Sequence, residues 1–360
     1  MFTWMNRLLI LLFALMLPAL SHARKNNYYS GFNTDALWQK LVLHDPGYDI
    51  NISSKDTAIV VVSNRATASG QLRFMSEERD GDSIRFFIVY TQNGLWHVQQ
   101  RHSLRTAMDA LPQKDKDWVV YTEGMGKIFT TDLDRGLGLA AQYGVNVLLL
   151  DYPIIHSGYK SYRNYRFAYK NSLIAYKDFI AALDSFKYLR KQKLAGSGTL
   201  TLFFHSMGNN VLRKIAQRGP IGSYNDEVWV ENLVMNAPCV PRRGSRRWMN
   251  RIHFAKRQYV HYNPEDGTLR WARIAGFRQI LGEHAKKPIA DEALFINFNR
   301  LCGNGHNNFM DLYGRPPAMK EAVTHYRTLF HGGAVPLSDT AMYRRSDYRG
   351  IGWDLIPANK

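Results

Sequence analysis

The sequence predicts an α/β protein with a mostly parallel central sheet and helices on both faces. From Asp117 onward, short apolar runs alternate with segments of helical periodicity. The runs are rich in β-branched and aromatic residues and close on turn residues, as buried strands do. Alternation of this kind is typical of a parallel sheet covered on both sides. With 360 residues, 45% of them hydrophobic, the chain can bury one large core.

The expected elements follow in chain order. Two apolar runs before the alternation predict strands at 56–63 and 83–90. Apolar residues three and four positions apart predict the helices, as with Leu173, Ile180 and Leu183 in the longest one. The alternating part predicts strands at 118–121, 145–151, 199–205, 233–237, 258–262 and 293–298, and helices at 133–143, 172–191, after Ser206, at 268–281 and at 317–330.

The N-terminus has the features of a secretory signal. Arg7 precedes a short apolar run, and the small residues Ser21 and Ala23 follow it. The run is short for a membrane span of about 20 residues, and an uncleaved anchor is the alternative. We therefore expect a signal peptide over residues 1–23, cleaved near Ala23, and a periplasmic or secreted protein. An N-terminal extension (24–55) and a single α/β domain (56–360) follow.

The chain is strongly basic, with 47 Lys and Arg against 30 Asp and Glu and a net charge of +17. An exported basic protein meets anionic lipid surfaces and polyanionic wall polymers, so we expect no nucleic-acid partner. The densest basic stretch lies at 242–257, between two predicted strands. It is either a solvated face or a surface that attracts membrane or acidic substrate, and residues 240–257 are a candidate cap over a pocket.

No signal for a cofactor or metal emerges. Gly136-Leu-Gly-Leu imitates a dinucleotide fingerprint but lies inside a predicted helix, whereas the fingerprint follows a strand directly. The histidines form no metal-ligand pair on one helix face. We therefore expect neither a cofactor nor a metal. Cys239 and Cys302 are compatible with one disulfide in an oxidising compartment, and the sequence leaves their pairing open.

The stretch from Thr199 to Asn209 is the most informative of the chain. An apolar strand runs directly into His205-Ser-Met-Gly208, and a helical pattern follows at once. A serine on such a tight turn has a strained backbone and an outward-facing hydroxyl, close to free N–H groups of the helix. This pattern predicts that Ser206 is a nucleophile; the alternative is a helix N-cap.

Two later strand ends supply partners for Ser206. Asp266 follows the strand at 258–262, and His306 follows the strand at 293–298 on a Gly-rich loop. The carboxyl ends of parallel strands meet at one edge of a sheet, so the three side chains are expected together. His306 would take the serine proton, and Asp266 would orient the ring. Glu265 is a rival acid, and turn or loop roles are the alternatives for Asp266 and His306.

The oxyanion of such a reaction needs two backbone N–H donors. One is expected from Met207, the residue after the serine. The other is expected from the loop at 123–126, which follows the strand at 118–121. We expect Met125 to be this second donor, with Gly124 as the alternative. A Gly-rich turn without a role in catalysis is the competing interpretation.

On these residues the chain resembles the α/β-hydrolase superfamily, and is most similar to a bacterial family of esterase/lipase-like hydrolases of unknown function. The resemblance covers about Thr57 to Phe309 and implies an α/β-hydrolase fold with a Ser206, Asp266 and His306 triad. Its landmarks are Asn64-Arg65, Phe74, Glu78-Arg79-Asp80, Glu123-Gly124, Asp151-Tyr-Pro153, His205-Ser-Met-Gly-Asn209, Asn236-Ala-Pro238, Asp266 with Leu269, and Gly305-His306.

Three positions depart from the pattern of the relatives. Phe204 stands where relatives often have Gly or Ala, so the turn must find room for a ring. Glu123 replaces the histidine often seen in the oxyanion loop, and its carboxylate would oppose an oxyanion if it faced inward. Cys239 replaces an aspartate that often follows Ala-Pro, which removes a rival to Asp266.

The sequence therefore predicts an exported serine hydrolase that cleaves an ester or related acyl bond through an acyl-enzyme. The substrate would be a small-molecule or lipid acyl compound. Because of Phe204 and Glu123, the alternative is a catalytically silent binding protein of the cell envelope. A group of basic and aromatic residues has two interpretations: the side chains line a substrate entrance, or they form a packed, amphipathic helix face. These residues are Tyr159, Lys160, Tyr162, Arg163, Tyr165, Arg166, Tyr169 and Lys170.

Overall fold

The computed structural model of the chain describes residues 33–70, 72–285, 290–312, 316–347 and 351–358. The predicted signal peptide and the first part of the N-terminal extension lie outside the described residues. Within the described ranges, no helix combines the length and apolar character needed to cross a membrane.

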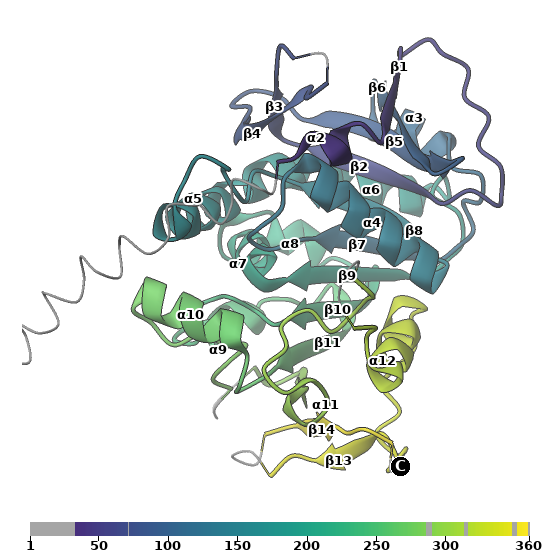
Figure 1. The fold of residues 1–360 in the computed structure, drawn as a ribbon. Helices are drawn as coiled ribbons and strands as arrows, with labels where there is room; N and C mark the ends of the chain where they lie inside the picture. The colour runs from purple at the N-terminus through teal and green to yellow at the C-terminus, as the bar shows by residue number, and fades with distance from the viewer. Residues whose placement is uncertain (1–32, 71, 286–289, 313–315, 348–350, 359–360) are drawn as a thin grey trace, which may run out of the picture.

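The structure is an α/β fold built on one large, mostly parallel sheet (Figure 1). Neighbouring strands run parallel except in the pairs β2–β5, β5–β6 and β13–β14. In sheet order the 12 strands are β1 (Leu41–His44), β6 (Leu95–Arg101), β5 (Arg85–Gln92), β2 (Ala58–Ser63), β8 (Asn146–Asp151), β7 (Trp118–Thr122), β9 (Leu200–His205), β10 (Val230–Asn236), β11 (Ala255–Tyr262), β12 (Ala293–Asn297), β14 (Trp353–Leu355) and β13 (Tyr343–Arg345).

The strand order reverses next to β7. The chain passes from β7 outward to β8 and then returns to β9 on the other side of β7. Such a reversal opens a crevice at the carboxyl ends of the two central strands, where ligands bind in open α/β sheets. The predicted oxyanion loop follows β7 and Ser206 follows β9, so both lie at this point.

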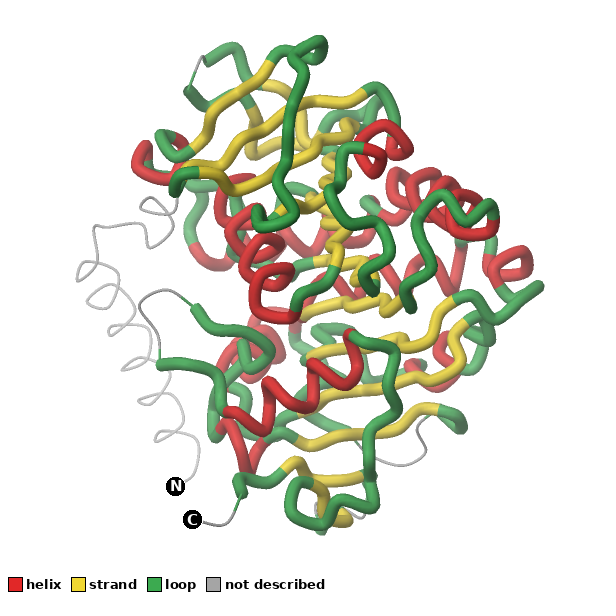
Figure 2. Tube along the Cα trace, turned by 90° about the vertical axis from the view of Figure 1, so that its right-hand side faces the viewer, coloured by secondary structure: helices red, strands yellow, loops and turns green. Residues whose placement is uncertain are grey.

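Helices cover both faces of the sheet because the central strands are apolar on both sides. Every residue of β2 is buried: Val60 and Val62 pack into one core, and Ile59 and Val61 into the other. Figure 2 shows the strands through the middle of the molecule with helices on either side. One face carries α2 (Asp35–Trp38), α4 (Phe129–Tyr143) and α12 (Lys320–Phe330); the other carries α3 (Leu104–Asp109), α5 (Ser161–Ile174), α6 (Tyr176–Lys191), α7 (Asn209–Arg218), α8 (Ile221–Tyr224), α9 (Ser245–Met249) and α10 (Gly267–Gly276).

Several elements differ from the prediction. The helix expected at 172–191 is two helices, α5 and α6, which meet at Ala175 without a proline or glycine to mark the break. The strand at 293–298 is not the last one, because the short strands β14 and β13 extend the sheet beyond it. The N-terminal extension contributes β1, which pairs with β6 at the opposite edge. A short α11 (Asn299–Cys302) and a small sheet of β3 (Arg65–Thr67) and β4 (Met75–Arg79) complete the fold.

The two cysteines do not pair in the structure. Cys239 is buried beside the candidate site, and both thiols are free. Burial raises the pKa of the Cys239 thiol to about 12, so this side chain is not a thiolate at neutral pH.

Buried histidines tie the sheet to α12 and to the candidate site. The Nε2 atoms of His325 and His261 lie 3.0 Å apart, and His325 Nδ1 lies 2.8 Å from the Tyr343 hydroxyl. Burial lowers the pKa of His325 to about 3. Burial also lowers the pKa of His205 to about 3, although Glu123 opposes this shift. Both rings are therefore neutral in the folded protein at neutral pH.

We expect the free energy of unfolding to fall as the pH drops below the ordinary histidine pKa of 6.5. A histidine whose pKa is lowered by folding binds its proton more readily in the unfolded chain. Its stabilising effect is complete above that pH and declines by about 1.4 kcal/mol per pH unit down to its folded pKa. Urea unfolding across this range measures the slope.

His325→Gln should reduce that slope by about 1.4 kcal/mol per pH unit. His102→Gln is the matched control, because His102 is exposed and should leave the slope unchanged. Equal slopes in the wild type and His325→Gln would show that His325 is not held neutral by the fold.

Candidate active site

Ser206 sits on a strained turn between β9 and α7, as its sequence context predicts. Its φ is +51°, a left-handed value that a serine rarely adopts. The turn continues as one 3₁₀ turn, Ser206–Gly208, into α7. The Asn209 amide donates to the carbonyl oxygens of Phe204, Ser206 and Asn236 at 2.8, 3.1 and 3.2 Å. Asn209 therefore holds the strained turn in place, a role that sequence reasoning did not assign.

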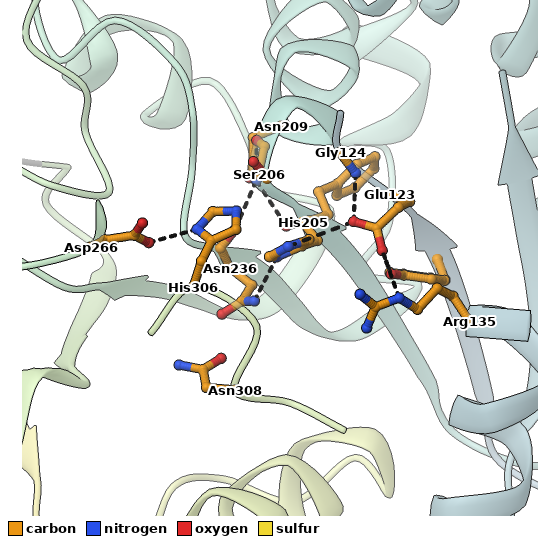
Figure 3. Close-up of polar contacts among 12 residues, drawn as sticks. Glu123, Gly124, Arg135, His205, Ser206, Asn209, Asn236, Asp266, His306 and Asn308 are labelled. Atoms are coloured by element: carbon orange, nitrogen blue, oxygen red, sulfur yellow. Dashed lines mark hydrogen bonds and ion pairs between the residues drawn. The ribbon is translucent and has the colours of Figure 1, made fainter. Parts of the chain in front are cut away.

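His306 and Asp266 form a close pair, as predicted. His306 Nδ1 lies 2.6 Å from Asp266 Oδ2 (Figure 3). The other carboxylate oxygen of Asp266 accepts from the Leu269 N–H at 2.9 Å, which caps the start of α10. The rival acid, Glu265, is exposed. Of the two carboxylates that the sequence left open, Asp266 is the one that orients the imidazole.

Asn263 fixes the loop that carries His306. Its side-chain amide donates to the carbonyl oxygens of Gly303 and Gly305 at 2.8 and 3.0 Å. These bonds tie the Gly-rich loop after β12 to the end of β11, so the two strand ends that supply Asp266 and His306 are locked together. Sequence reasoning missed Asn263; its place just before the Pro264 turn, next to Asp266, was the available signal.

Ser206 and His306 line one cavity of about 280 Å³ at the carboxyl ends of the strands. Its wall combines apolar side chains, among them Met125, Met207 and Trp271, with the charged side chains of Glu123 and Lys127. Ser206 is nearly buried, at 6% exposure. Its hydrogen bonds to described residues are made by its backbone carbonyl, which accepts from the Asn209 side chain and the Cys239 N–H. In enzymes without substrate the hydrogen bonds between catalytic side chains are often long and tighten on binding.

The candidate cap contributes little to this cavity. None of residues 240–257 lines it in the described structure; the first turns of α10 form that wall instead. Part of the basic stretch is paired, with Arg246 lying 2.8 Å from Asp291 and Arg257 lying 3.3 Å from Glu231. The role of this segment as a cap stays a prediction.

The loop after β7 packs directly against the Ser206 turn. A Cβ added at Gly124 would lie 2.5 Å from Ser206 Cβ and 3.0 Å from the Met207 nitrogen, so only glycine fits there. The Gly124 N–H is already used, because it donates to Glu123 Oε1 at 2.7 Å. The Met125 N–H makes no hydrogen bond with a described residue. The two donors that remain for an oxyanion are thus those of Met125 and Met207, whereas the alternative, Gly124, is occupied.

Glu123 is buried and its charge is compensated. One carboxylate oxygen lies 3.6 Å from His205 Nε2; the other accepts from the Tyr121 hydroxyl and lies 3.8 Å from Arg135 Nε (Figure 3). Burial alone would raise the pKa of Glu123. Lys127, His205, Arg135 and the Tyr121 hydrogen bond outweigh it and lower that pKa to about 2. Both oxygens of the carboxylate are therefore engaged beside the loop after β7.

Phe204 is accommodated in the core. Its ring is fully buried and belongs to the apolar cluster that includes Met207, Val211 and Met235. The core next to the Ser206 turn therefore has room for an aromatic ring at this position.

Phe204→Ala is expected to lower the free energy of unfolding by about 3 to 5 kcal/mol, because it removes buried surface and leaves a cavity. Urea unfolding measures the loss. Phe277→Ala is the matched control: that ring is 90% exposed and its removal should change stability by less than about 0.5 kcal/mol. A loss below about 1 kcal/mol in Phe204→Ala would mean that the core closes around the smaller side chain.

The chain matches no protein-family model, and neither a curated protein nor a solved structure is significantly similar to it. Functional inference therefore rests on the geometry of the site. Among the residues that the structure describes, no group of three or more His, Cys, Asp or Glu side chains could hold a metal ion.

Proposed function

We propose that this protein is an exported serine hydrolase with an α/β-hydrolase fold, similar to esterase/lipase-like enzymes, that cleaves an ester or related acyl bond. The observation that carries this proposal is one cavity that brings Ser206, at φ +51°, together with the His306–Asp266 pair. A strained serine between a strand and a helix, followed along the chain by Asp and His, is the arrangement of this class of hydrolase. Export is proposed on the sequence of residues 1–23 alone.

The reaction would proceed through an acyl-enzyme. Ser206 Oγ bonds to the acyl carbon while His306 takes its proton, with the carbonyl oxygen held by the N–H groups of Met207 and Met125. The bond to the leaving alcohol then breaks as His306 returns the proton to that oxygen. Water attacks the acyl-enzyme in the same way and releases the acid. Asp266 holds the ring of His306 and offsets its charge throughout.

A fluorophosphonate probe tests the proposal, because it labels only an activated serine. We expect labelling of the wild type, none of Ser206→Ala, and loss of turnover with an intact fold in His306→Ala. A panel of aryl esters of increasing chain length would then define the acyl preference. A folded wild type that the probe leaves unlabelled would refute the hydrolase and favour a silent binding protein of the cell envelope. Ester turnover that survives in His306→Ala would mean that another group is the base.

A further inference from the structure

The outer side of α10 carries three large apolar side chains that are left open to solvent. Trp271, Ile274 and Phe277 are 38%, 61% and 90% exposed. They follow one another at intervals of three residues, so they lie along one side of the helix and its end. Exposed apolar side chains that gather in this way mark an interaction surface, whereas isolated ones need no explanation.

Helix α5 continues this surface. The rings of Tyr165 and Trp271 lie 5.5 Å apart, and the Arg278 guanidinium lies 4.1 Å above the ring of Tyr169. Arg278 also donates to the hydroxyls of both tyrosines. Figure 1 shows α5 and α10 at the same edge of the molecule. The exposed residues of these two helices are called the α5–α10 face below.

The face is positively charged without compensation. Residues 158–174 contain four cations and no acidic residue. Helix α10 adds the exposed Arg270. None of these cations has a carboxylate within 4.0 Å among the described residues, in contrast to Arg246 and Arg257. The four cations of the α5 segment are Lys160, Arg163, Arg166 and Lys170.

The face borders the candidate active site. Trp271 belongs to both, because its side chain is part of the exposed strip and also lines the cavity of Ser206. Leu269 and Ala272, on the inner side of the same helix, line that cavity as well. A surface bound to this face would therefore lie next to the entrance to the cavity.

We propose that the α5–α10 face docks the protein on an anionic phospholipid surface. Ile274, Phe277 and the exposed edge of Trp271 would enter the boundary between headgroups and acyl chains. The unpaired cations would meet lipid phosphates, and each adds to the attraction near a negative surface. The occupant is inferred from this charge complementarity. That the substrate is an ester of such a lipid rests, in addition, on the proposed hydrolase function.

Co-sedimentation with lipid vesicles tests the docking. The purified protein is expected to bind vesicles of phosphatidylcholine mixed with phosphatidylglycerol far better than vesicles of phosphatidylcholine alone. Ile274→Ser/Phe277→Ser and, separately, Arg163→Gln/Arg166→Gln/Lys170→Gln should each weaken binding to the mixed vesicles by at least about tenfold. Added salt should weaken binding of the wild type.

Matched variants control for lost apolar surface and lost charge. Leu43→Ser/Val228→Ser removes two exposed apolar side chains elsewhere; Val228 has the same 61% exposure as Ile274. Lys55→Gln/Lys193→Gln/Arg344→Gln removes three exposed cations away from the face. Both control variants should bind like the wild type. Docking is refuted if the wild type does not bind anionic vesicles. It is also refuted if the variants of the α5–α10 face bind these vesicles as well as the control variants do.

The two proposals fail in different ways. Ser206→Ala should bind vesicles like the wild type, so docking is measured without any turnover. If the protein hydrolyses soluble aryl esters but does not bind vesicles, docking is refuted and the proposed hydrolase function is supported. If it binds vesicles but is not labelled by the fluorophosphonate, the hydrolase function is refuted and docking is supported. A dimer that Ile274→Ser/Phe277→Ser dissociates, with no vesicle binding, would assign the face to self-association and overturn the lipid proposal.

Discussion

Asp266→Asn is expected to lower kcat for an ester substrate by about 10⁴-fold while the fold stays intact. Asp266 has two roles in the structure: one oxygen orients His306 from 2.6 Å, and the other caps α10 through the Leu269 N–H at 2.9 Å. Asparagine is an equally good cap. The asparagine amide is neutral, so it lacks the negative charge that stabilises a protonated His306. Its NH2 group can also donate to Nδ1, which favours the wrong tautomer of the ring. The rate should therefore fall without a comparable loss of stability.

Steady-state kinetics and urea unfolding of the same preparations separate the two roles. Asp266→Ala should lose the rate and, in addition, about 0.5 to 2 kcal/mol of stability, because the cap is lost as well. Glu265→Gln is the control at the neighbouring, exposed carboxylate and should leave kcat nearly unchanged. If Asp266→Asn kept the full rate and Glu265→Gln lost it, the acid would have to be reassigned to Glu265.

The sequence was sufficient where local patterns and chain direction decide the structure. The largely apolar run from Leu200 to His205 predicts a buried strand, and every residue of that strand is buried in the structure. An abrupt change to helical spacing after Ser206 predicted the turn. Parallel strands end at one edge, and this alone predicted that Asp266 and His306 would lie together. The grouping of these side chains was thus predictable because each one follows a strand of the parallel part of the sheet: Ser206 directly, and Asp266 and His306 within the next loop.

The remainder depends on contacts between distant segments. β6 mixes polar and apolar residues and was missed, because its place beside β5 comes from pairing and not from its own pattern. The charge of Glu123 is balanced in part by Arg135, which comes from α4 and which no local pattern around Glu123 indicates. Asn263 acts on a loop 40 residues later in the chain. The cavity wall also depends on contacts between distant segments. Residues of α10 line it, whereas the predicted cap at 240–257 does not.

Gly124→Ala is the second substitution expected to have a very large effect, a loss of about 10² to 10³ in kcat/KM. The new Cβ would lie 2.5 Å from Ser206 Cβ and 3.0 Å from both Ser206 Oγ and the Met207 nitrogen. These atoms belong to a strained turn, not to the flexible end of a side chain, so only a backbone shift relieves the clash. That shift moves the proposed nucleophile, Ser206, and one proposed oxyanion donor, the Met207 N–H, together.

Gly222→Ala is the matched control, because a Cβ there meets nothing within 4 Å and the residue lies in the short helix α8. It should retain activity, whereas Gly124→Ala should lose both ester turnover and rapid fluorophosphonate labelling. Unfolding experiments decide whether that loss is local. A folded but inactive Gly124→Ala means that the spacing between the β7 loop and the Ser206 turn is itself required for catalysis. A folded and fully active variant would show that this close spacing is not required for catalysis.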